Sequence, residues 1–437
     1  MPDLLGLPVD PESAAVLAEQ GLRLALLDPA DGDAVREWRH AVNRGFLDPE
    51  AIEEQHLEAL PDFPGRRTLG IYDDGLVEPT RPIATIDAWE APLSLPGGDV
   101  PVAAISAVTV APTHRRRGVA RAMLGGELRT AAAAGLPVAA ITVSEATIYD
   151  RFGFGPATSA AELAIDARRL RWIGPDAPGR VQFVGRDRIL ADAPDLFERA
   201  RRRTPGGVGL SGLLLTRLFG RTSDPVDLRS HRFARYDDAD GVPQGFVSYR
   251  AVESESDFAA STLTVHHLAA ATEEAEAALW RFLLEMDLIG EVRAPLRSVD
   301  EPLPWQVDDR RAIRTTAVRD HLWLRVLDPV AALGARTYTG PGSAVIDVTD
   351  PAGFAAGRWL LAVDEAGRAS VTPAGDSSDT VPEVALGASA LGSLLPGGVR
   401  ASVLARAGRI RERRAGDAAA LDRLVLSPVT PWLGIWF

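Results

Sequence analysis

Neither cysteine nor lysine occurs anywhere in this sequence of 437 residues. Without cysteine, disulfide bonds, thiolate-ligated metal centres and thiol nucleophiles are excluded, and the chain suits a reducing compartment. Without lysine, Schiff-base chemistry and a phosphate loop with its usual lysine are excluded. All 47 basic side chains are therefore arginine. A GC-rich genome, whose codons disfavour lysine, is the simplest explanation of this bias.

Long apolar runs are also missing. No run of ~18 apolar residues occurs, so we expect no membrane span. The first five residues, Met1 to Leu5, lack the basic and apolar regions of a signal peptide. We expect a cytoplasmic protein, with secretion by a route that needs no signal peptide left open. The seven histidines show no metal-ligand spacing, so no metal site is expected.

The charge balance is acidic, with a formal net charge of −13. Such a surface disfavours nucleic acid and anionic membranes as partners and attracts cationic ligands. Apolar residues make up 46% and charged residues 24%, which is ordinary for a globular protein. The length exceeds that of one hydrophobic core, so roughly two to four domains are expected.

Three series of elements follow one another along the chain. In the first, we expect helical structure over 14–60, strands over 68–72, 83–89 and 102–110, a loop over 91–98, a helix over 119–134 and a strand over 138–143. The β–α–β order indicates a mixed sheet with a crossover helix. A second series, with strands over 181–184, 244–251 and 263–268 and a helix over 272–287, loosely repeats the first. A third has strands over 322–326, 344–348, 359–363 and 369–372, then an Ala- and Leu-rich stretch over 383–405.

The most informative stretch joins a strand to a helix. The strand ends at Val110, an arginine-rich turn with Arg115–Arg117 follows, and a helix opens at about Gly118. A helix N-terminus offers unpaired N–H groups and a partial positive charge, which suit a pyrophosphate. Glycine lets the backbone approach the phosphates, and the small Ala120 keeps the next turn open. A solvated arginine turn is the alternative.

Two motifs here resemble the GNAT acetyltransferase superfamily. Arg115-x-x-Gly118-x-Ala120 is similar to its pyrophosphate loop, and Tyr149 to Phe154 resembles the Y-x-x-x-G-F element that closes its cofactor site. The resemblance implies acetyl-coenzyme A as co-substrate and direct attack by an amine, with no covalent enzyme intermediate. It also implies a splayed strand around Val108 that binds the pantetheine arm. The implied cofactor-binding residues are Val108, Thr109, Val110, Arg115, Arg116, Arg117, Gly118, Val119, Ala120, Arg121, Ser144 and Glu145. A structural cap remains an alternative role for Ser144.

Longer stretches are similar to the actinobacterial Eis (enhanced intracellular survival) family of GNAT N-acetyltransferases. They cover residues 107–119, 144–158, 278–281, 302–304 and 322–325. The resemblance implies an α/β (α+β) protein with a GNAT domain over 1–168, a second, degenerate GNAT-like domain over 169–320 and a sterol-carrier-protein-like α+β domain over 321–437. It also implies a homo-oligomer, a hexamer. Because Ala269–Glu274 carries acidic residues in place of a pyrophosphate loop, we expect one cofactor per chain, in the first domain.

The resemblance also implies catalytic roles. Tyr149 would be the general acid that protonates the coenzyme A thiolate, and the C-terminal carboxylate of Phe437 the general base. Alternatively, Tyr149 is a core tyrosine, and the apolar tail packs only for stability. The family's acidic residue beside the last Phe is replaced here by Trp436. Asp48, Asp87 and Glu90 are candidate amine contacts, with solvated carboxylates as the alternative.

Three functions fit these observations. The first is acetyl transfer to amines of a polycationic acceptor, such as an aminoglycoside or a polyamine. The second keeps the chemistry but takes a peptide or protein lysine as acceptor. The third is a non-catalytic sensor that binds acyl-coenzyme A or a lipid. A nucleic-acid role does not fit the acidic charge.

Overall fold

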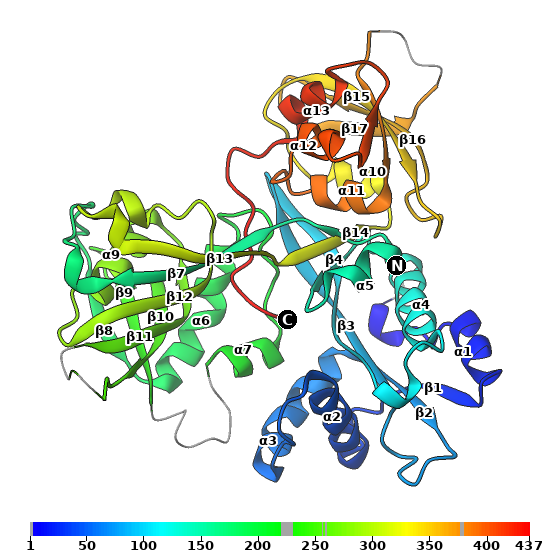
Figure 1. The fold of residues 1–437 in the computed structure, drawn as a ribbon, viewed down its shortest axis with the longest axis horizontal. Coiled ribbons are helices and arrows are strands. Elements are labelled where there is room, and N and C mark those ends of the chain that lie inside the picture. The colour runs from blue at the N-terminus through cyan, green and yellow to red at the C-terminus, as the bar shows by residue number, and fades with distance from the viewer. Residues whose placement is uncertain (1–2, 220–229, 256, 258–259, 376–379) are drawn as a thin grey trace.

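The computed structural model describes residues 3–219, 230–255, 257, 260–375 and 380–437. Within these residues the chain forms two seven-stranded sheets and one five-stranded sheet. The two larger sheets lie side by side, and the third lies beyond the first in the orange and yellow part of Figure 1. No helix in the described part of the chain is both long and apolar enough to span a membrane.

The first sheet has the strand order β1-β2-β3-β4-β5-β14-β6. Its strands are β1 (Leu22–Leu26), β2 (Arg67–Asp73), β3 (Ala84–Leu95), β4 (Gly98–Val110), β5 (Val138–Thr142), β6 (Gly155–Pro156) and β14 (Leu322–Val326). The helices of this region are α1 (Pro11–Ala18), α2 (Gly32–Phe46), α3 (Glu53–Ala59), α4 (Val119–Ala133) and α5 (Ala146–Tyr149). Crossover helix α4 makes β4 and β5 parallel, and it shares one buried cluster with α1 and the adjacent face of the sheet.

Two of the predictions for this region are wrong. A strand, β1, interrupts the helical segment expected over 14–60, because Leu22, Leu24 and Leu26 alternate with the period of a strand. The loop expected over 91–98 is strand up to Leu95. Pro92 lies opposite Pro101 in the hairpin of β3 and β4. The Pro92 carbonyl accepts at 2.8 Å from the N–H of Gly209, which lies outside this hairpin. The ladder between β3 and β4 therefore needs no N–H at this pair, and the two prolines remove no hydrogen bond from it.

The second sheet repeats the order of the first, as β8-β9-β10-β11-β12-β7-β13. Its strands are β7 (Ser159–Asp166), β8 (Arg180–Val184), β9 (His231–Asp237), β10 (Pro243–Val252), β11 (Ser261–Ala270), β12 (Ile289–Arg297) and β13 (Ile313–Asp320). Helices α6 (Arg186–Arg201) and α9 (Glu273–Leu284) belong to different buried clusters on this sheet, and α7 (Gly212–Leu218) follows α6.

The two sheets exchange strands through one antiparallel ribbon. β6 and β7 are consecutive along the chain, as are β13 and β14. β6 pairs with β14 and β7 pairs with β13, with one register shift between Thr315 and Ala317. Between the sheets, Ala157 N–H donates to the Leu322 carbonyl at 2.8 Å, and His321 N–H donates to the Thr158 carbonyl at 3.0 Å. This ribbon, defined by β6–β7 and β13–β14, therefore belongs to both sheets.

The predicted domain boundaries at residues 168 and 320 lie close to this exchange. β7 precedes the first boundary but pairs in the second sheet, and β14 follows the second boundary but pairs in the first. The boundaries remain predictions, and a cut at either of them would divide a sheet.

The third sheet has the order β17-β16-β15-β18-β19. Its strands are β15 (Gly342–Thr349), β16 (Gly357–Val363), β17 (Ala369–Pro373), β18 (Glu383–Gly387) and β19 (Ile410–Glu412), and its helices are α10 (Pro329–Gly334), α11 (Ala388–Leu394), α12 (Ala401–Arg406) and α13 (Asp417–Val425). α11 packs on β14 and β6. A buried ion pair crosses the same junction, because Arg325 on β14 donates to both oxygens of Asp350 at 2.7 Å.

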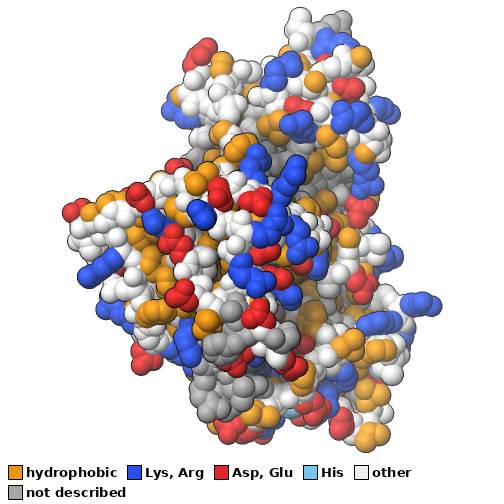
Figure 2. Space-filling view, turned by 60° about the vertical axis from the view of Figure 1, so that its left-hand side comes forward, with side chains coloured by type: hydrophobic (Ala, Val, Ile, Leu, Met, Phe, Trp, Pro, Cys, Tyr) orange, Lys and Arg blue, Asp and Glu red, His pale blue; other side chains and the backbone are white. Residues whose placement is uncertain are grey.

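The acidic excess is not gathered into one patch on the face seen in Figure 2. Arginine and acidic side chains are interspersed across that face. Several ion pairs among the described residues are exposed and of the i,i+4 type, such as Arg281 with Glu285 and Arg368 with Asp364. Such exposed pairs contribute little to stability, so the charge acts mainly through its long-range field.

Replacing Asp350 with alanine leaves the Arg325 guanidinium as an unpaired charge in the junction. We expect Asp350→Ala to lower the free energy of unfolding, measured in urea, by about 3–5 kcal/mol. The control is Asp74→Ala, which removes the exposed ion pair with Arg23 and should cost less than ~1 kcal/mol. Equal losses in the two variants would contradict a structural role for the buried pair.

Candidate active site

A wedge opens between β4 and β5 in the first sheet. Val102–Ile105 of β4 pairs in parallel with Val138–Ile141 of β5. The pairing stops there, although β4 continues to Val110. A bulge lies where β3 pairs with this part of β4, and Ala107 has a left-handed φ of 52°. The ladder therefore ends halfway along β4, and an extended ligand could pair with the second half of the strand.

The arginine-rich turn lies at the open end of this wedge. Arg115, Arg116, Arg117 and Arg121 are exposed, and α4 begins immediately after Gly118. Gly118 has a φ of 81°, a conformation that favours glycine, and a Cβ built there would meet no atom within 4 Å. Four exposed arginines thus lie in the turn and the first residues of α4, beside a glycine with open surroundings, an arrangement that suits a pyrophosphate.

His114 fixes this turn to the sheet, a role that the sequence reasoning missed. Its buried ring bonds Asp73 Oδ2 through Nε2 at 3.1 Å and Thr113 Oγ1 through Nδ1 at 2.8 Å. Arg115 Nε donates to the Val110 carbonyl at 3.2 Å. The aspartate at the end of β2 gave no sequence signal, because its partner lies 41 residues further along the chain.

Tyr149 lies beyond the open end of β5. Ser144 and Glu145 are exposed on the connecting segment, and Tyr149 ends the short helix α5 with a buried side chain. Its ring meets that of Phe154 edge to face, with centroids 6.2 Å apart. Burial, with the nearby Glu145 carboxylate, raises the pKa of Tyr149 to about 12. The phenol is therefore protonated throughout the physiological pH range.

The C-terminal tail reaches the end of β5 on the face of the first sheet opposite to Tyr149. Thr142 Oγ1, on the last residue of β5, donates to a Phe437 oxygen at 2.5 Å and accepts from the Phe437 N–H at 3.3 Å. The buried Phe437 ring lies edge to face with Trp89 at 5.6 Å. His321 on the ribbon donates from Nε2 to the Ile435 carbonyl at 2.7 Å. The red tail in Figure 1 accordingly runs between the two large sheets.

A buried polar cluster adjoins Phe437. Asp87 forms an ion pair with Arg66, whose guanidinium lies 4.0 Å above the Trp89 ring and donates to Ser211 Oγ at 3.0 Å. Among the described residues, Asp87 Oδ1 and Trp89 Nε1 have no hydrogen-bond partner. Asp87 is thus already paired with a cation, a contact that its spacing from Arg66 did not reveal.

The other two candidate amine contacts lie apart from this cluster. Asp48 is exposed after the end of α2. Glu90 is exposed on β3, where alternation directs it to the face opposite Trp89. The structure does not bring Asp48, Asp87 and Glu90 together. In the described part of the chain, no group of three or more acidic or histidine side chains is arranged to hold a metal ion.

Comparisons with known proteins agree with this architecture. Models of the acetyltransferase (GNAT) domain match residues 27–157 and 217–326, and a sterol carrier protein domain model matches residues 329–434. An uncharacterized N-acetyltransferase of Streptomyces avermitilis is 37% identical over 405 residues, which cover 91% of this chain and 94% of that protein. N-acetyltransferase Eis of Mycobacterium tuberculosis is 37% identical over 342 residues, or 76% of this chain and 79% of Eis.

A solved structure extends the similarity to three dimensions. The crystal structure of Eis1 from Mycobacterium abscessus has a TM-score of 0.79 and 30% identity, and the match covers 95% of this chain and 100% of that one. The fold and the wedge with its arginine turn define a GNAT N-acetyltransferase, a class that uses acetyl-coenzyme A and acts on amines. Within that class, the chain belongs to the Eis family, with two GNAT domains and a sterol-carrier-protein-like domain. The predicted fold class is confirmed.

The conformation of Gly118 allows a matched test of the arginine turn. In Gly118→Val, the valine would have to adopt the left-handed backbone conformation, which costs roughly 1–2 kcal/mol. A shift of the turn would relieve this strain and displace the arginines. We expect the dissociation constant for coenzyme A, measured calorimetrically, to rise about tenfold. Gly353 in the third domain has the same left-handed conformation, with a φ of 82°, and equally open surroundings, so Gly353→Val should leave the affinity unchanged. Unaltered affinity in Gly118→Val would argue against a cofactor site at this turn.

Proposed function

We propose that this chain transfers the acetyl group of acetyl-coenzyme A directly to amines of a polycationic small molecule, such as an aminoglycoside or a polyamine. One observation carries the proposal: Phe437 is hydrogen-bonded to Thr142 where β4 and β5 part, and Tyr149 follows on the same connection. A donor in the wedge would have a carboxylate on one side and a phenol on the other.

The two groups belong to opposite faces of the first sheet. Phe437 lies in the buried cluster that includes Trp89, Ala104 and Ala140, whereas Tyr149 lies in the cluster on the face of α4. A thioester held between the strands would therefore be open to an amine on one face while its sulfur met Tyr149 on the other. In this scheme the amine nitrogen attacks the carbonyl carbon, the C–N bond forms and the C–S bond breaks.

We assign the cofactor contacts to Val108, Thr109 and Val110 for the pantetheine arm, and to the turn from Arg115 to Arg121 for the phosphates. Ser144 and Glu145, exposed at the mouth of the wedge, would flank the thioester. The backbone of β4 beyond Ile105 is not paired with β5, which supports the first assignment. The exposure of the arginines supports the second.

The acid–base roles follow from the surroundings of each group. Because burial raises the pKa of Tyr149 to about 12, this phenol is a weaker acid than a thiol, whose ordinary pKa is ~8.5. Tyr149 would therefore stabilise the departing thiolate mainly as a hydrogen-bond donor. A terminal carboxylate, which ordinarily has a pKa of ~3.5, is a weak base. Phe437 would hold the ammonium group of the acceptor and take a proton from it, so that the free amine attacks the carbonyl carbon. The second proton that the nitrogen loses as the amide forms would pass to solvent or to the departing thiolate.

The acidic surface and the carboxylate of Phe437 support a cationic acceptor. By family resemblance, we propose a hexameric assembly. A panel of aminoglycosides, polyamines, lysine derivatives and basic peptides, assayed by release of the coenzyme A thiol, tests the acceptor. The chain has no thiol of its own, so the background is clean. Turnover confined to peptides would indicate a protein acetyltransferase, and binding of acetyl-coenzyme A without any turnover would indicate a sensor.

Loss of the phenol should slow the chemical step. We expect Tyr149→Phe to lower kcat at least ~100-fold, the usual contribution of a positioned hydrogen-bond donor to a developing anion, with little change in the KM for acetyl-coenzyme A. The matched control is Tyr338→Phe in the third domain, which removes another buried phenol whose pKa burial raises to about 12. A Tyr149→Phe enzyme with wild-type kcat would assign Tyr149 to packing only.

The tail can be tested by separating its carboxylate from its ring. Adding one glycine after Phe437 keeps the ring beside Trp89 but moves the carboxylate away, and we expect kcat/KM for the amine to fall at least ~100-fold. Phe437→Ala keeps the carboxylate and loses the ring contact, so its loss should be smaller and accompanied by lower thermal stability. Full activity in the glycine-extended enzyme would exclude the carboxylate as base.

A further inference from the structure

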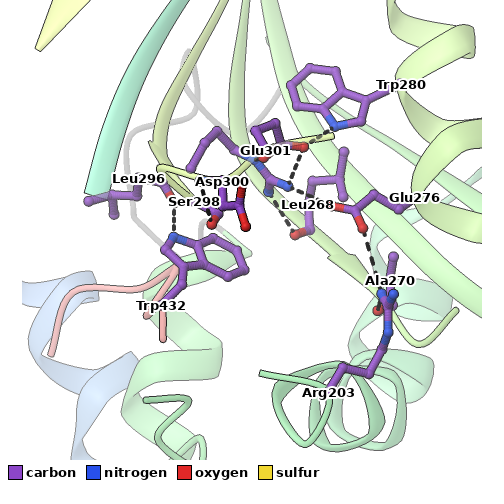
Figure 3. Close-up of polar contacts among 11 residues, drawn as sticks. Arg203, Leu268, Ala270, Glu276, Trp280, Leu296, Ser298, Asp300, Glu301 and Trp432 are labelled. Carbon is purple, nitrogen blue, oxygen red and sulfur yellow. Dashed lines mark hydrogen bonds and ion pairs between the residues drawn. The ribbon is translucent and has the colours of Figure 1, made fainter. Parts of the chain in front are cut away.

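A second hollow lies in the second domain, away from the wedge of the first. Its volume is about 510 Å³. The end of β11, the first turn of α9, the segment after β12 and the tail from Pro428 to Gly434 surround it. Phe197, Leu268 and Trp432 contribute apolar surface, and Glu273 and Asp300 stand on its exposed side. Figure 3 shows Trp432 on the tail and Asp300 on the segment after β12, two of the residues that line this hollow.

Its position corresponds to that of the wedge in the first sheet. β11 and β12 pair in parallel only from Ser261 to Thr264 and from Ile289 to Arg293, and α9 crosses between them as α4 crosses between β4 and β5. The helix start differs, because Glu273, Glu274 and Glu276 occupy the first turn of α9. Acidic side chains there repel phosphate, so a coenzyme A pyrophosphate would not bind.

The inner charges of the cavity are compensated. The buried Arg297 donates to Glu301 Oε2 at 2.9 Å and to Glu276 Oε1 at 3.1 Å. Arg203 lies 3.7 Å from the other Glu276 oxygen and donates to the Ala270 carbonyl at 2.9 Å (Figure 3). Arg201, the third arginine of the wall, donates to Asp99 and Glu198. Among the described lining residues, each guanidinium is thus held by acceptors of the chain itself.

The carboxylates on the exposed side are not compensated. Within the described residues neither Glu273 nor Asp300 belongs to an ion pair, and Asp300 accepts only from Thr430 Oγ1 on the tail, at 3.1 Å. Two carboxylates thus face the entrance of a cavity whose interior charges cancel. The resulting field favours a cation.

A buried imidazole adds a second, independent sign of a ligand. His267 forms part of the cavity wall, is only 6% exposed and stacks on Phe197 with ring centroids 5.6 Å apart. Burial and the nearby Arg297 lower the pKa of His267 to about 4, so the ring is neutral. Its Nε2 has no hydrogen-bond partner in the part of the chain that the structure describes. A neutral imidazole with an unused nitrogen can accept a hydrogen bond from an N–H group.

We propose that this cavity is a second ligand site of the chain, selective for a small aliphatic polyamine. One ammonium group would lie between Glu273 and Asp300, the hydrocarbon segments would pack on Phe197 and Trp432, and an inner N–H would donate to His267. The cavity holds such a molecule, and its charge pattern rejects coenzyme A. This proposal does not depend on acetyl transfer, because the residues that carry it lie outside the wedge.

The tail connects this site with the first domain. Trp432 donates from its indole to the Leu296 carbonyl at 2.8 Å, and Arg297 lies 5.0 Å from the Trp432 ring. Five residues later, Phe437 bonds Thr142. An occupant that contacts Trp432 and Asp300 would therefore restrain the segment that carries the terminal carboxylate.

Calorimetric titration of spermine into the full-length protein, without acetyl-coenzyme A, tests the site. The double variant Glu273→Gln/Asp300→Asn removes the two exposed charges, and Ala200→Trp fills the cavity without changing charge. Glu19→Gln/Glu365→Gln, two exposed carboxylates in other domains, is the charge-matched control. All variants keep the wedge and Phe437, so spermine bound at the active site is common to all of them.

We expect the Glu273/Asp300 double variant to bind spermine at one site at least tenfold more weakly than wild type, and Ala200→Trp to lose that site. The control should bind as wild type does, and saturating coenzyme A should not displace the spermine. Wild-type affinity and stoichiometry in both cavity variants would overturn the proposal. Equal weakening in the control would also overturn it, because the binding would then reflect only the overall acidic field. Loss of acetyl transfer activity would bear on the proposed function alone.

Discussion

The antiparallel ribbon in which β6 and β7 pair with β14 and β13 is the constraint on which the rest of the molecule depends. Each large sheet is closed by a strand that the other half of the chain supplies, so neither has a complete hydrogen-bond ladder alone. The ribbon also carries His321, which receives the tail, and Arg325, which holds the third domain. The wedge, the tail and the sterol-carrier-protein-like domain are thus all positioned from one pair of strands.

Arginine makes the joints between these parts, in a chain that has no lysine. Arg201 at the end of α6 donates to Asp99 Oδ1 and Oδ2, both at 2.9 Å, on the β3–β4 hairpin. Arg67 forms a buried ion pair with Glu127 between β2 and α4, and Arg325 pairs with both oxygens of Asp350. A planar guanidinium can bond both oxygens of a carboxylate at once, which fixes orientation as well as distance. The joints are therefore directional.

Sequence reasoning predicted the local chemistry better than the long-range pairing. The strand, arginine turn and helix around Gly118 are adjacent in the chain, and the resemblance to known enzymes identified the family and the three-part fold. β1 was missed because its five residues lie between two helices whose pattern dominates the segment. Arg66, Trp89 and Thr142 gave no signal, since their contacts with Asp87 and Phe437 depend on strand register and on the path of the tail. The cavity beside Trp432 was equally unpredictable, because it forms between segments that are distant in sequence.

The strand exchange also sets an order for synthesis on the ribosome. When β5 has emerged, the strand that covers its open edge, β14, has not yet been made, and the whole second domain must be translated first. Until then β5 presents unpaired N–H and C=O groups and an apolar face, the features that promote association between chains. Because its closing contacts span so much of the sequence, the first domain should complete its fold slowly and late. Expression of residues 1–168 alone would yield a sheet with a permanently open edge.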